Sequence, residues 1–431
     1  MANRVAFTDL LSDIVDNRGR TCPTAPSGTP LIATNRVRND LLYPALEKLR
    51  YVDDATYDTW FRGHPQPGDI IFVCKGTPGR VCLAPDPVGF CIAQDMVAVR
   101  PDPEKVYPKF LFALLRSRDV QAQIENMHVG SLIPHFKKGD FDKLLLDIPD
   151  APVQKQIGDL YFALSSKIDL NRRMNETLEA MARALFKSWF VDFGPVRANA
   201  EGRAPSGMDA DTAKLFPNEL VDSELGPIPK GWTVGSVYEL CEVDYGAPYS
   251  SKRFVEGGPG RPVIRIRDLA SQNPSVRTDE VHARDVAIGP GDIVVGMDGE
   301  FRVHVWAGEA AVLNQRLCRV RPKVQRDGTF VRLDIEPPLA FVERTEVATT
   351  VIHLGKSDID QFVVVLPERR VLDAFAHLVG PLEARQLTLA KEGRTLGRLR
   401  DELLPRLLSG ELPITEAAGL SKMEALAEAS G

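Results

Sequence analysis

The sequence predicts an α+β fold: two mixed, mainly β domains and two long antiparallel coiled-coil helices, arranged as a pseudo-twofold internal repeat. Three observations lead to this fold class. Short apolar runs bounded by Gly, Pro and Asp are typical of strands. Two long segments place an apolar residue at every third or fourth position, as amphipathic helices do. Both patterns occur twice in the same order along the 431 residues.

The repeat is carried by four pairs of matched segments. PGDIIFVCKG matches PGDIVVGMDG, QDMVAVRP matches QRLCRVRP, IPHFKKGD matches VIHLGKSD, and LLLDIP matches FVVVLP. The pairs begin at Pro67 and Pro290, Gln94 and Gln315, Ile133 and Val351, and Leu144 and Phe362. The offset between copies falls from 223 to 221 to 218 residues, so the copies differ in the lengths of their loops.

Local patterns place the elements. Strands are expected at DIIFVC from Asp69, MVAV from Met96, DIVV from Asp292 and FVVVL from Phe362. A helix is expected over Tyr107–Ile124, where apolar residues fall at helical spacing.

Two apolar seams predict the long helices. The first comprises Val153, Ile157, Leu160, Leu164, Ile168, Asn171, Asn175, Leu178, Ala182, Leu185 and Trp189, and the second Leu372, Phe375, Val379, Leu382, Leu389, Leu396, Leu399, Leu403 and Leu407. A helix of roughly 37 residues is about 55 Å long and would not be stable with its seam exposed. We therefore expect the helices to pair, antiparallel, with a domain at each end. A helix pair of that length could place two DNA-binding domains on sites about one turn of B-DNA apart.

The charge balance, the apolar runs and the cysteine spacing exclude several classes of function. The net charge is −6, residues 1–149 carry 18 basic and 18 acidic side chains, and residues 230–370 carry 19 and 20. This balance excludes DNA binding by bulk charge alone. No apolar run is long enough to span a membrane, and no signal peptide is recognisable, so a cytoplasmic protein is expected. The six cysteines form no CxxC pair, and neither they nor the scattered histidines suggest a metal site; buried reduced thiols are expected.

Several motifs together resemble type I restriction–modification specificity (S) subunits. They are QKQIGDL from Gln154, KIDLNRRMNETLEAMARALFKSWFVDFGPV from Lys167, ELGPIPKGW from Glu224, NQRLCRVRP from Asn314 and LLPRLLSGEL from Leu403. The resemblance covers nearly the whole chain. The chain would then consist of target-recognition domain 1 (1–149), a central spacer helix (150–193), a connector (194–229), target-recognition domain 2 (230–369), a distal spacer helix (370–410) and a C-terminal tail (411–431).

The resemblance implies a non-catalytic subunit that reads a bipartite, asymmetric DNA target. Its expected partners are double-stranded DNA, two methyltransferase subunits and motor–nuclease subunits, with no membrane. S-adenosylmethionine, ATP and Mg are expected on the partner subunits, and no cofactor or metal on this chain. Two features depart from the family pattern: the second helix lacks the Asn pair and the KSWF ending, and residues 415–431 match nothing recognisable.

Candidate DNA contacts are basic and amide side chains of the β domains, because Arg and Lys suit guanine and Asn suits adenine. Each of them could instead contact phosphate or only solvent. They are Asn35, Arg36, Arg38, Lys75, Arg80, Lys137 and Lys138 in the first domain, and Lys252, Arg253, Arg265, Arg267, Arg302 and Lys356 in the second. Positions shared by the copies should serve the fold, so Gln94 and Gln315 are expected to be structural. For His135 and His353 a structural hydrogen bond is favoured over a DNA contact.

Two further groups have open roles. Asn171 and Asn175 either fix the register of the helix pair, as a buried Asn does in a coiled coil, or lie in solvent where the helix rolls. The aromatic residues at the end of the first helix either contact a partner or pack on the adjoining connector. They are Phe186, Trp189, Phe190 and Phe193.

Two other classes of function stay open at this stage. One is a self-sufficient DNA methyltransferase or nuclease fusion, which the missing glycine-rich cofactor loop disfavours. The other is a coiled-coil scaffold with protein-binding domains, which predicts no sequence-specific DNA binding.

Overall fold

The protein divides into two compact units, seen in a computed structural model that describes residues 3–17, 21–127, 133–345 and 352–412. Unit 1 contains residues 1–171 and 392–431, and unit 2 contains residues 172–391. Nearly all of the expected tail lies outside the described residues. The helices α4 (Ala151–Phe186) and α9 (Arg369–Leu408) each contribute one part to each unit. The units therefore cut through both helices, whereas the expected domain boundaries kept the helices apart from the domains.

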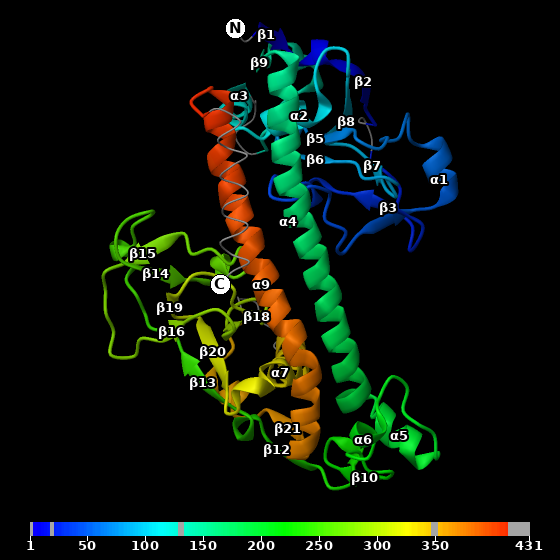
Figure 1. Cartoon of the computed structure of the whole chain (residues 1–431), viewed down its shortest axis with the longest axis vertical. Helices are drawn as coiled ribbons and strands as arrows, with labels where there is room; N and C mark the ends of the chain where they lie inside the picture. The colour runs from blue at the N-terminus through cyan, green and yellow to red at the C-terminus, as the bar shows by residue number, and fades with distance from the viewer. Residues whose placement is uncertain (1–2, 18–20, 128–132, 346–351, 413–431) are drawn as a thin grey trace. The chain divides into compact units, whose positions relative to one another are not determined.

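Unit 1 combines short strands with the beginning of α4 and the end of α9 (Figure 1). Its other elements are β1 (Asn3–Ala6), η1 (Phe7–Leu10), β2 (Leu11–Val15), β3 (Thr29–Ile32), η2 (Thr34–Arg36), β4 (Arg50–Val52), α1 (Asp54–Thr59), β5 (Ile70–Val73), β6 (Val81–Leu83), β7 (Cys91–Ile92), β8 (Met96–Pro101), α2 (Pro108–Leu115), α3 (Arg118–Met127), η3 (Lys138–Lys143) and β9 (Leu145–Ile148).

The central sheet of unit 1 has the strand order β2-β8-β5-β6, and a second sheet has the order β4-β3-β7. Side chains alternate between the faces of a strand. On β5, Ile70 and Phe72 face a core shared with α2, whereas Ile71 and Val73 face a core shared with β3 and β7. Because both faces are covered, the strand reads as a continuous apolar run, and its predicted position is confirmed.

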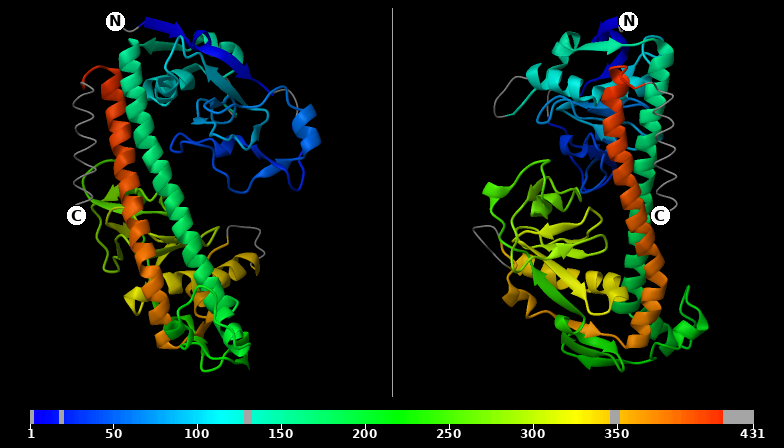
Figure 2. Two further views of the ribbon diagram at one scale, coloured as in Figure 1. Left: turned by 45° about the vertical axis from the view of Figure 1, so that its right-hand side comes forward. Right: turned by 60° about the vertical axis from the view of Figure 1, so that its left-hand side comes forward.

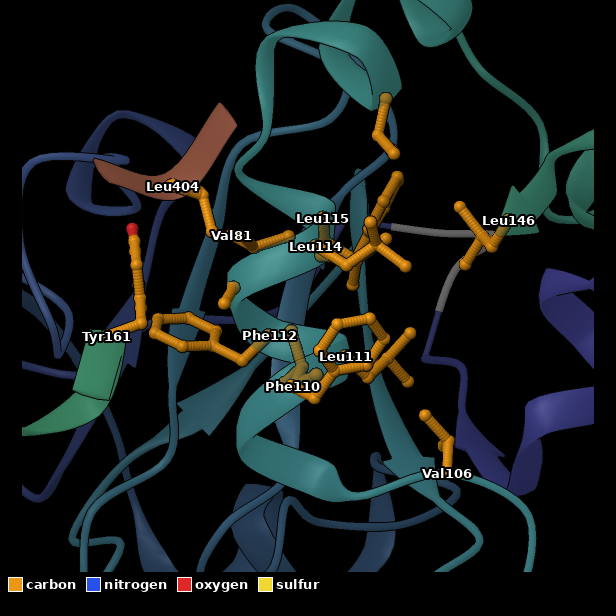
Figure 3. Packing of buried hydrophobic residues seen from close by; sticks show 14 of the residues in the cluster. Val81, Val106, Phe110, Leu111, Phe112, Leu114, Leu115, Leu146, Tyr161 and Leu404 are labelled. Atoms are coloured by element: carbon orange, nitrogen blue, oxygen red, sulfur yellow. The ribbon is translucent and has the colours of Figure 1, made fainter. Parts of the chain in front are cut away.

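The ends of both long helices complete the core of unit 1. Figure 3 shows α2 packed with Tyr161 from α4 and Leu404 from α9. The α9 leucines in this core are Leu396, Leu399, Leu403, Leu404 and Leu407. Thus the last part of the second repeat's helix fills the core of the first unit.

The QKQIGDL motif fixes the start of α4 to the domain before it. Gln154 accepts a 2.9 Å hydrogen bond from the backbone N–H of Tyr107 and donates one of 2.8 Å to the carbonyl of Pro149. Asp159 accepts from the Tyr107 hydroxyl at 2.7 Å and from Lys109 Nζ at 3.1 Å. Gly158 lies where a side chain would meet α2, since an added Cβ would be 2.6 Å from the backbone nitrogen of Phe110.

Unit 2 repeats this design with its own strands and the remaining parts of the long helices. Its other elements are a π-helical turn (Lys187–Val191), α5 (Gly194–Ala200), α6 (Ala210–Ala213), β10 (Leu220–Ser223), β11 (Gly226–Pro229), β12 (Thr233–Ser236), η5 (Val237–Glu239), β13 (Cys241–Tyr245), η6 (Ser251–Arg253), β14 (Arg261–Ile264), η7 (Ile266–Asp268), β15 (Val276–Thr278), β16 (Ala287–Ile288), β17 (Ile293–Gly296), β18 (Val303–Val305), β19 (Ala311–Leu313), β20 (Leu317–Pro322), η8 (Gln325–Asp327), α7 (Gly328–Thr345), α8 (Lys356–Ile359) and β21 (Val363–Leu366).

The two units share one topology. The order β13-β20-β17-β18 in unit 2 corresponds to β2-β8-β5-β6 in unit 1, and β15-β14-β19 corresponds to β4-β3-β7. Strand β17 begins 223 residues after β5, β20 begins 221 after β8, and α9 begins 218 after α4. These are the offsets of the matched sequence segments, so the predicted internal repeat and the α+β fold class are confirmed.

Within each unit the two long helices run antiparallel (Figure 2). In unit 1, Arg400 contacts Ser165 at 3.5 Å and Glu392 contacts Asn171 at 2.9 Å. In unit 2, Gln386 donates to the carbonyl of Asn175 at 3.3 Å. As residue numbers rise along α4, those of its partners on α9 fall. The predicted antiparallel helices are therefore confirmed.

Two helix predictions were wrong in detail. The helix expected over Tyr107–Ile124 is interrupted between α2 and α3, where the buried Arg116 guanidinium donates to the carbonyl of Val81 at 2.8 Å. The first long helix becomes a π-helical turn after Phe186, and Phe193 then takes a left-handed backbone (φ 51) before α5 begins. In both places the apolar spacing continues in the sequence although the α-helix does not.

The close approach at Gly158 gives a prediction for stability. We expect Gly158→Ala to lower the free energy of unfolding by about 1–3 kcal/mol, because α2 or α4 must shift to admit the methyl group. The matched control is Gly397→Ala on α9, where no atom lies within 4 Å of the added Cβ among the described residues; this should stabilise by about 0.5–1 kcal/mol. Denaturant unfolding of both variants tests this, and equal effects of the same sign would contradict it.

A buried carboxyl in unit 2 gives a second prediction. Among the described residues Asp334 Oδ2 has no hydrogen-bond partner, and burial raises the pKa of Asp334 to about 7. Between pH 4 and pH 7 the unfolded chain releases this proton first, so the contribution of Asp334 to stability falls as pH rises. Relative to Asp334→Asn, the wild type should lose on the order of 2–3 kcal/mol between pH 5 and pH 8. Urea unfolding at both pH values measures this, and parallel pH profiles would refute it.

Candidate nucleic-acid interface

In unit 1, three segments distant in sequence meet where the central strand β5 ends. The backbone N–H of Gly76 donates to the carbonyl of Pro134 at 2.9 Å, and that of Cys74 donates to the carbonyl of Asp95 at 2.8 Å. Gly76 has a left-handed backbone (φ 87), which glycine adopts without a steric cost. In unit 2 the same bonds join Gly299 to Ile352 at 3.0 Å and Met297 to Arg316 at 2.9 Å.

The corner residues of this frame carry opposite charges in the two units. Asp95 (φ 73) and Arg316 (φ 72) occupy the same left-handed position. In unit 1, Lys75 Nζ lies 3.9 Å from Asp95. In unit 2 the aspartate and the cation exchange places, with Arg316 3.2 Å from Asp298. One backbone frame thus presents inverted charges.

His353 takes part in this corner of unit 2. Its Nδ1 lies 2.7 Å from Asp298 Oδ1, and the two residues form an isolated β-bridge. His135 forms the matching bridge with Lys75 in unit 1. The structural hydrogen bond favoured from the sequence is therefore present at His353.

The predicted DNA-contacting cations of unit 1 fall into two surface regions. Lys75, Lys137 and Lys138 lie on the strand end and the adjoining loop just described, with Lys138 3.2 Å from Asp16. Asn35 and Arg36 lie together on η2. Arg38, two residues further on, forms an ion pair with Asp40. Arg80 is half-buried in the turn between β5 and β6.

Most of the candidates of unit 2 are engaged with carboxylates. The ion pairs are Arg253 with Asp279 at 2.8 Å, Arg265 with Asp268 at 3.0 Å, Arg302 with Glu300 at 2.5 Å and Lys356 with Asp360 at 2.7 Å. Lys252 and Arg267 lie on the short helices η6 and η7. A cation held by a carboxylate has to exchange that partner before it can bind DNA, so the role of these candidates stays a prediction.

Sequence reasoning missed three residues. Lys48 and Arg50 share a hollow with Asn35 and Arg36, although they lie in a different part of the chain. Pairing of β3 with β4, which sets Arg50 opposite Leu31, is the signal that could have found them. Arg316 was visible, because the matched segments align it with Asp95.

Of the two roles left open for the aromatic cluster at the end of α4, the structure favours packing on the connector. Phe186, Trp189, Phe190 and Phe193 are at most 8% exposed and belong to the core of unit 2. Trp189 packs on Phe216 from the connector, and Phe193 packs on Trp232. The helix seam alone cannot cover four aromatic rings, and the connector and the domain that follows it cover the rest. This is the second of the two interpretations drawn from the sequence.

The two asparagines of the seam lie against the paired helix. Asn171 is 2% exposed and donates to Glu392 at 2.9 Å, and Lys167 reaches the same carboxylate at 3.3 Å. Asn175 Oδ1 is buried and has no hydrogen-bond partner among the described residues. Their role in fixing the register stays a prediction.

Glu179, on α4, is a partly buried carboxylate between two arginines. Burial acts to raise the pKa of Glu179, but Arg332 at 2.8 Å and Arg183 at 2.6 Å outweigh it and hold that pKa below its usual value.

Burial raises the pKa values of four thiols to about 12, which leaves them protonated and unreactive at neutral pH. They are Cys82, Cys91, Cys241 and Cys318.

Among the described residues, no group of His, Cys, Asp and Glu side chains is able to hold a metal ion. Within the same residues, every helix is too short or too polar to cross a membrane.

Comparison with known proteins gives one consistent similarity. Residues 13–180 match the family model of the type I restriction modification DNA specificity domain. These residues therefore carry a domain of that family, and the resemblance seen in the sequence is confirmed.

Relatives extend the similarity along the chain. The chain is 27% identical over 399 residues to the type I restriction enzyme HindI specificity subunit of Haemophilus influenzae, covering 80% of this chain and 86% of that protein. It is 23% identical over 359 residues to the type I restriction enzyme MjaIX specificity subunit of Methanocaldococcus jannaschii, covering 81% and 78%. The fold is similar to the crystal structure of a type I restriction–modification S subunit from M. genitalium, with a TM-score of 0.53, 14% identity and coverage of 94% and 96%.

Burial of the aromatic cluster predicts how its removal acts. Phe190→Ala should lower the free energy of unfolding by about 3–5 kcal/mol, because the ring packs 4.8 Å from Phe330 and 5.0 Å from Phe375. Phe341→Ala is the control: that side chain is 60% exposed, so a change within about 0.5 kcal/mol is expected. Unfolding curves measure both, and unchanged stability of Phe190→Ala would restore the partner-contact hypothesis.

Proposed function

We propose that this chain is the non-catalytic DNA-recognition subunit of a type I restriction–modification complex. Each unit would read one half of a two-part target. The observation that carries this proposal is the repeated frame: two units with one topology present different polar side chains at equivalent positions.

The inverted corner illustrates why such units would differ in specificity. Direct readout depends on the pattern of donors and acceptors that a protein presents to base edges. Lys75 and Asp95 present one order of charge, and Asp298 and Arg316 present the reverse. Equal backbones with unequal side chains suit an asymmetric target, in which the half-sites differ.

The proposal includes partners. Double-stranded DNA is the ligand, two methyltransferase subunits are docked, and motor–nuclease subunits join for cleavage. S-adenosylmethionine, ATP and Mg would be held by those subunits and not by this chain. The type I restriction–modification DNA specificity domain at residues 13–180 supports this division of labour.

A methylation map tests the function. The full chain is co-expressed with the methyltransferase subunit expected to be encoded beside it, and modified bases are mapped on the host DNA. We expect adenine methylation at one two-part motif, dependent on this chain. Cells with the methyltransferase subunit alone are the control.

Three results would contradict the proposal. A stable complex without chain-dependent methylation would favour a scaffold. Methyl transfer by the purified chain alone would show an enzyme. Methylation at a single undivided motif would exclude two different half-site readers.

A further inference from the structure

A hollow in unit 1 gathers unpaired cations. It has a volume of about 300 Å³ and lies between η2 and the segment that leads into β4. Its lining residues are Leu31, Ala33, Asn35, Arg36, Lys48, Leu49 and Arg50. Among these described residues three are cationic and none is acidic.

The backbone brings these side chains together. Pairing of β3 with β4 sets Arg50 opposite Leu31 at the floor of the hollow. Arg36 Nη2 donates to the carbonyl of Lys48 at 3.5 Å, which joins the two sides. Asn35, Lys48 and Arg50 are exposed, so their polar ends are accessible from outside.

These cations differ from most others on the surface of the unit. Arg38 and Lys75 are paired with Asp40 and Asp95. Within the described residues, Arg36, Lys48 and Arg50 take part in no ion pair. Like charges that share a small space without counterions favour an anionic ligand.

Unit 2 has the same backbone frame at this place. Gly28 and Gly260 both have a positive φ (128 and 115), and an added Cβ would collide with the carbonyl of the paired strand in each. Leu31 opposite Arg50 corresponds to Val263 opposite Val276. The positions of the two units can therefore be matched residue by residue from these strands outward.

In unit 2 the matching place is occupied by an ion pair. Arg265 stands where unit 1 has Ala33, and its Nε donates to Asp268 at 3.0 Å, at the position of Arg36. Its guanidinium also contacts Ser275, at the position of Leu49. Asp268 is 3% exposed, so this arginine is needed to balance a buried carboxylate. The exposed Arg267 stands at the position of Asn35, so this place carries one cation beside the ion pair in unit 2 and three cations without a carboxylate in unit 1.

We propose that the hollow of unit 1 is a binding site for a phosphodiester group of the DNA backbone, with no counterpart in unit 2. This inference rests on the proposed function, and it specifies the contact by which unit 1 would be held on its half of the DNA target. A phosphate protrudes from the duplex and can enter a hollow, whereas base edges are recessed in a groove. Arg36, Lys48 and Arg50 supply charge-assisted donors, and the Asn35 amide supplies a neutral one.

The contact would position unit 1 without selecting a sequence, because phosphate contacts carry no base information. Removing a cation should therefore weaken binding to every duplex equally and reduce the salt dependence by about one counterion per contact. Recognition of the motif should be unchanged.

The test uses the full chain in complex with its methyltransferase subunit. Binding to a duplex with the mapped motif and to a scrambled duplex is measured across a salt series. The variants are Lys48→Gly and Arg50→Ala. Lys48 has a left-handed backbone (φ 45), so glycine removes the cation at a position where its backbone is favourable. The control is Lys105→Ala, an exposed lysine that is 3.3 Å from Asp102.

We expect each variant to lose about three- to tenfold in affinity on both duplexes, with a salt slope lower by about one, an unchanged melting temperature and the same methylated motif. The double variant Ala33→Arg, Arg36→Asp, which copies the Arg265–Asp268 ion pair of unit 2, should have the same effect. Lys105→Ala should bind as the wild type does.

Other results overturn the inference. Unchanged affinity and salt slope in both variants would remove the hollow from the DNA interface. Relaxed recognition at one base pair would assign it to base reading. A thermal shift with inorganic phosphate alone, lost in Lys48→Gly, would assign it to a free phosphate ligand. If the wild type does not distinguish the duplexes but the variants still lower the salt slope, the proposed function fails and the phosphate site stands.

Discussion

The exchange of helix ends between the two repeats is the constraint on which the rest of the structure depends. The core of unit 1 contains Leu399 and Leu403 from the helix that leaves the second repeat, and the core of unit 2 contains Phe186 and Phe190 from the helix that leaves the first. An exposed apolar seam of this length is unstable in water. Each helix therefore hides its seam in two cores, and neither unit has a complete core without residues from the other repeat. Polar contacts between the two helices, such as that of Lys167 with Glu392 at 3.3 Å, then favour the antiparallel pairing among the alternatives that an apolar seam would tolerate.

The two units keep the same backbone geometry but differ in the side chains on its surface. The left-handed corners at Asp95 and Arg316 keep one geometry while their charges are exchanged with Lys75 and Asp298. The same holds for the open hollow around Arg36 and the filled cluster around Arg265. In both cases backbone hydrogen bonds and strand pairs keep the frame the same, while each unit has its own set of side chains on it. Where a side chain has a structural role, as Arg265 has beside the buried Asp268, the set changes as a group and not one residue at a time.

Much of this architecture could be predicted from the sequence, because periodicity and self-similarity report backbone pairing directly. The offsets between matched segments equal the offsets between β5 and β17 and between α4 and α9. The candidate DNA-binding site was harder to predict, because it depends on which charged side chains are already bound to other residues in the folded protein. Arg265 looked as available as Arg36 until its bond to the buried Asp268 was seen. Lys48 and Arg50 gave no local signal, since strand pairing and a left-handed residue bring them to Arg36. The role of the aromatic cluster could not be decided from the sequence for the same reason: the residues that it packs on, Trp232 and Phe330 among them, are distant in sequence.

The balance of charge explains how a nearly neutral protein can bind a polyanion selectively. If the 18 basic side chains of residues 1–149 all faced solvent unpaired, binding would be strong and indifferent to sequence. Ion pairs such as those of Arg38 and Lys138 lower that non-specific affinity. Under the proposed function, cations without carboxylates, such as those that line the hollow, would then determine where the DNA backbone is held. Such a protein contributes little non-specific attraction of its own, so under the proposed function its binding to DNA would depend on geometry and on partner subunits. The cations of the hollow lie on unit 1 alone, so the two proposed half-site readers would differ in affinity as well as in the bases that they contact.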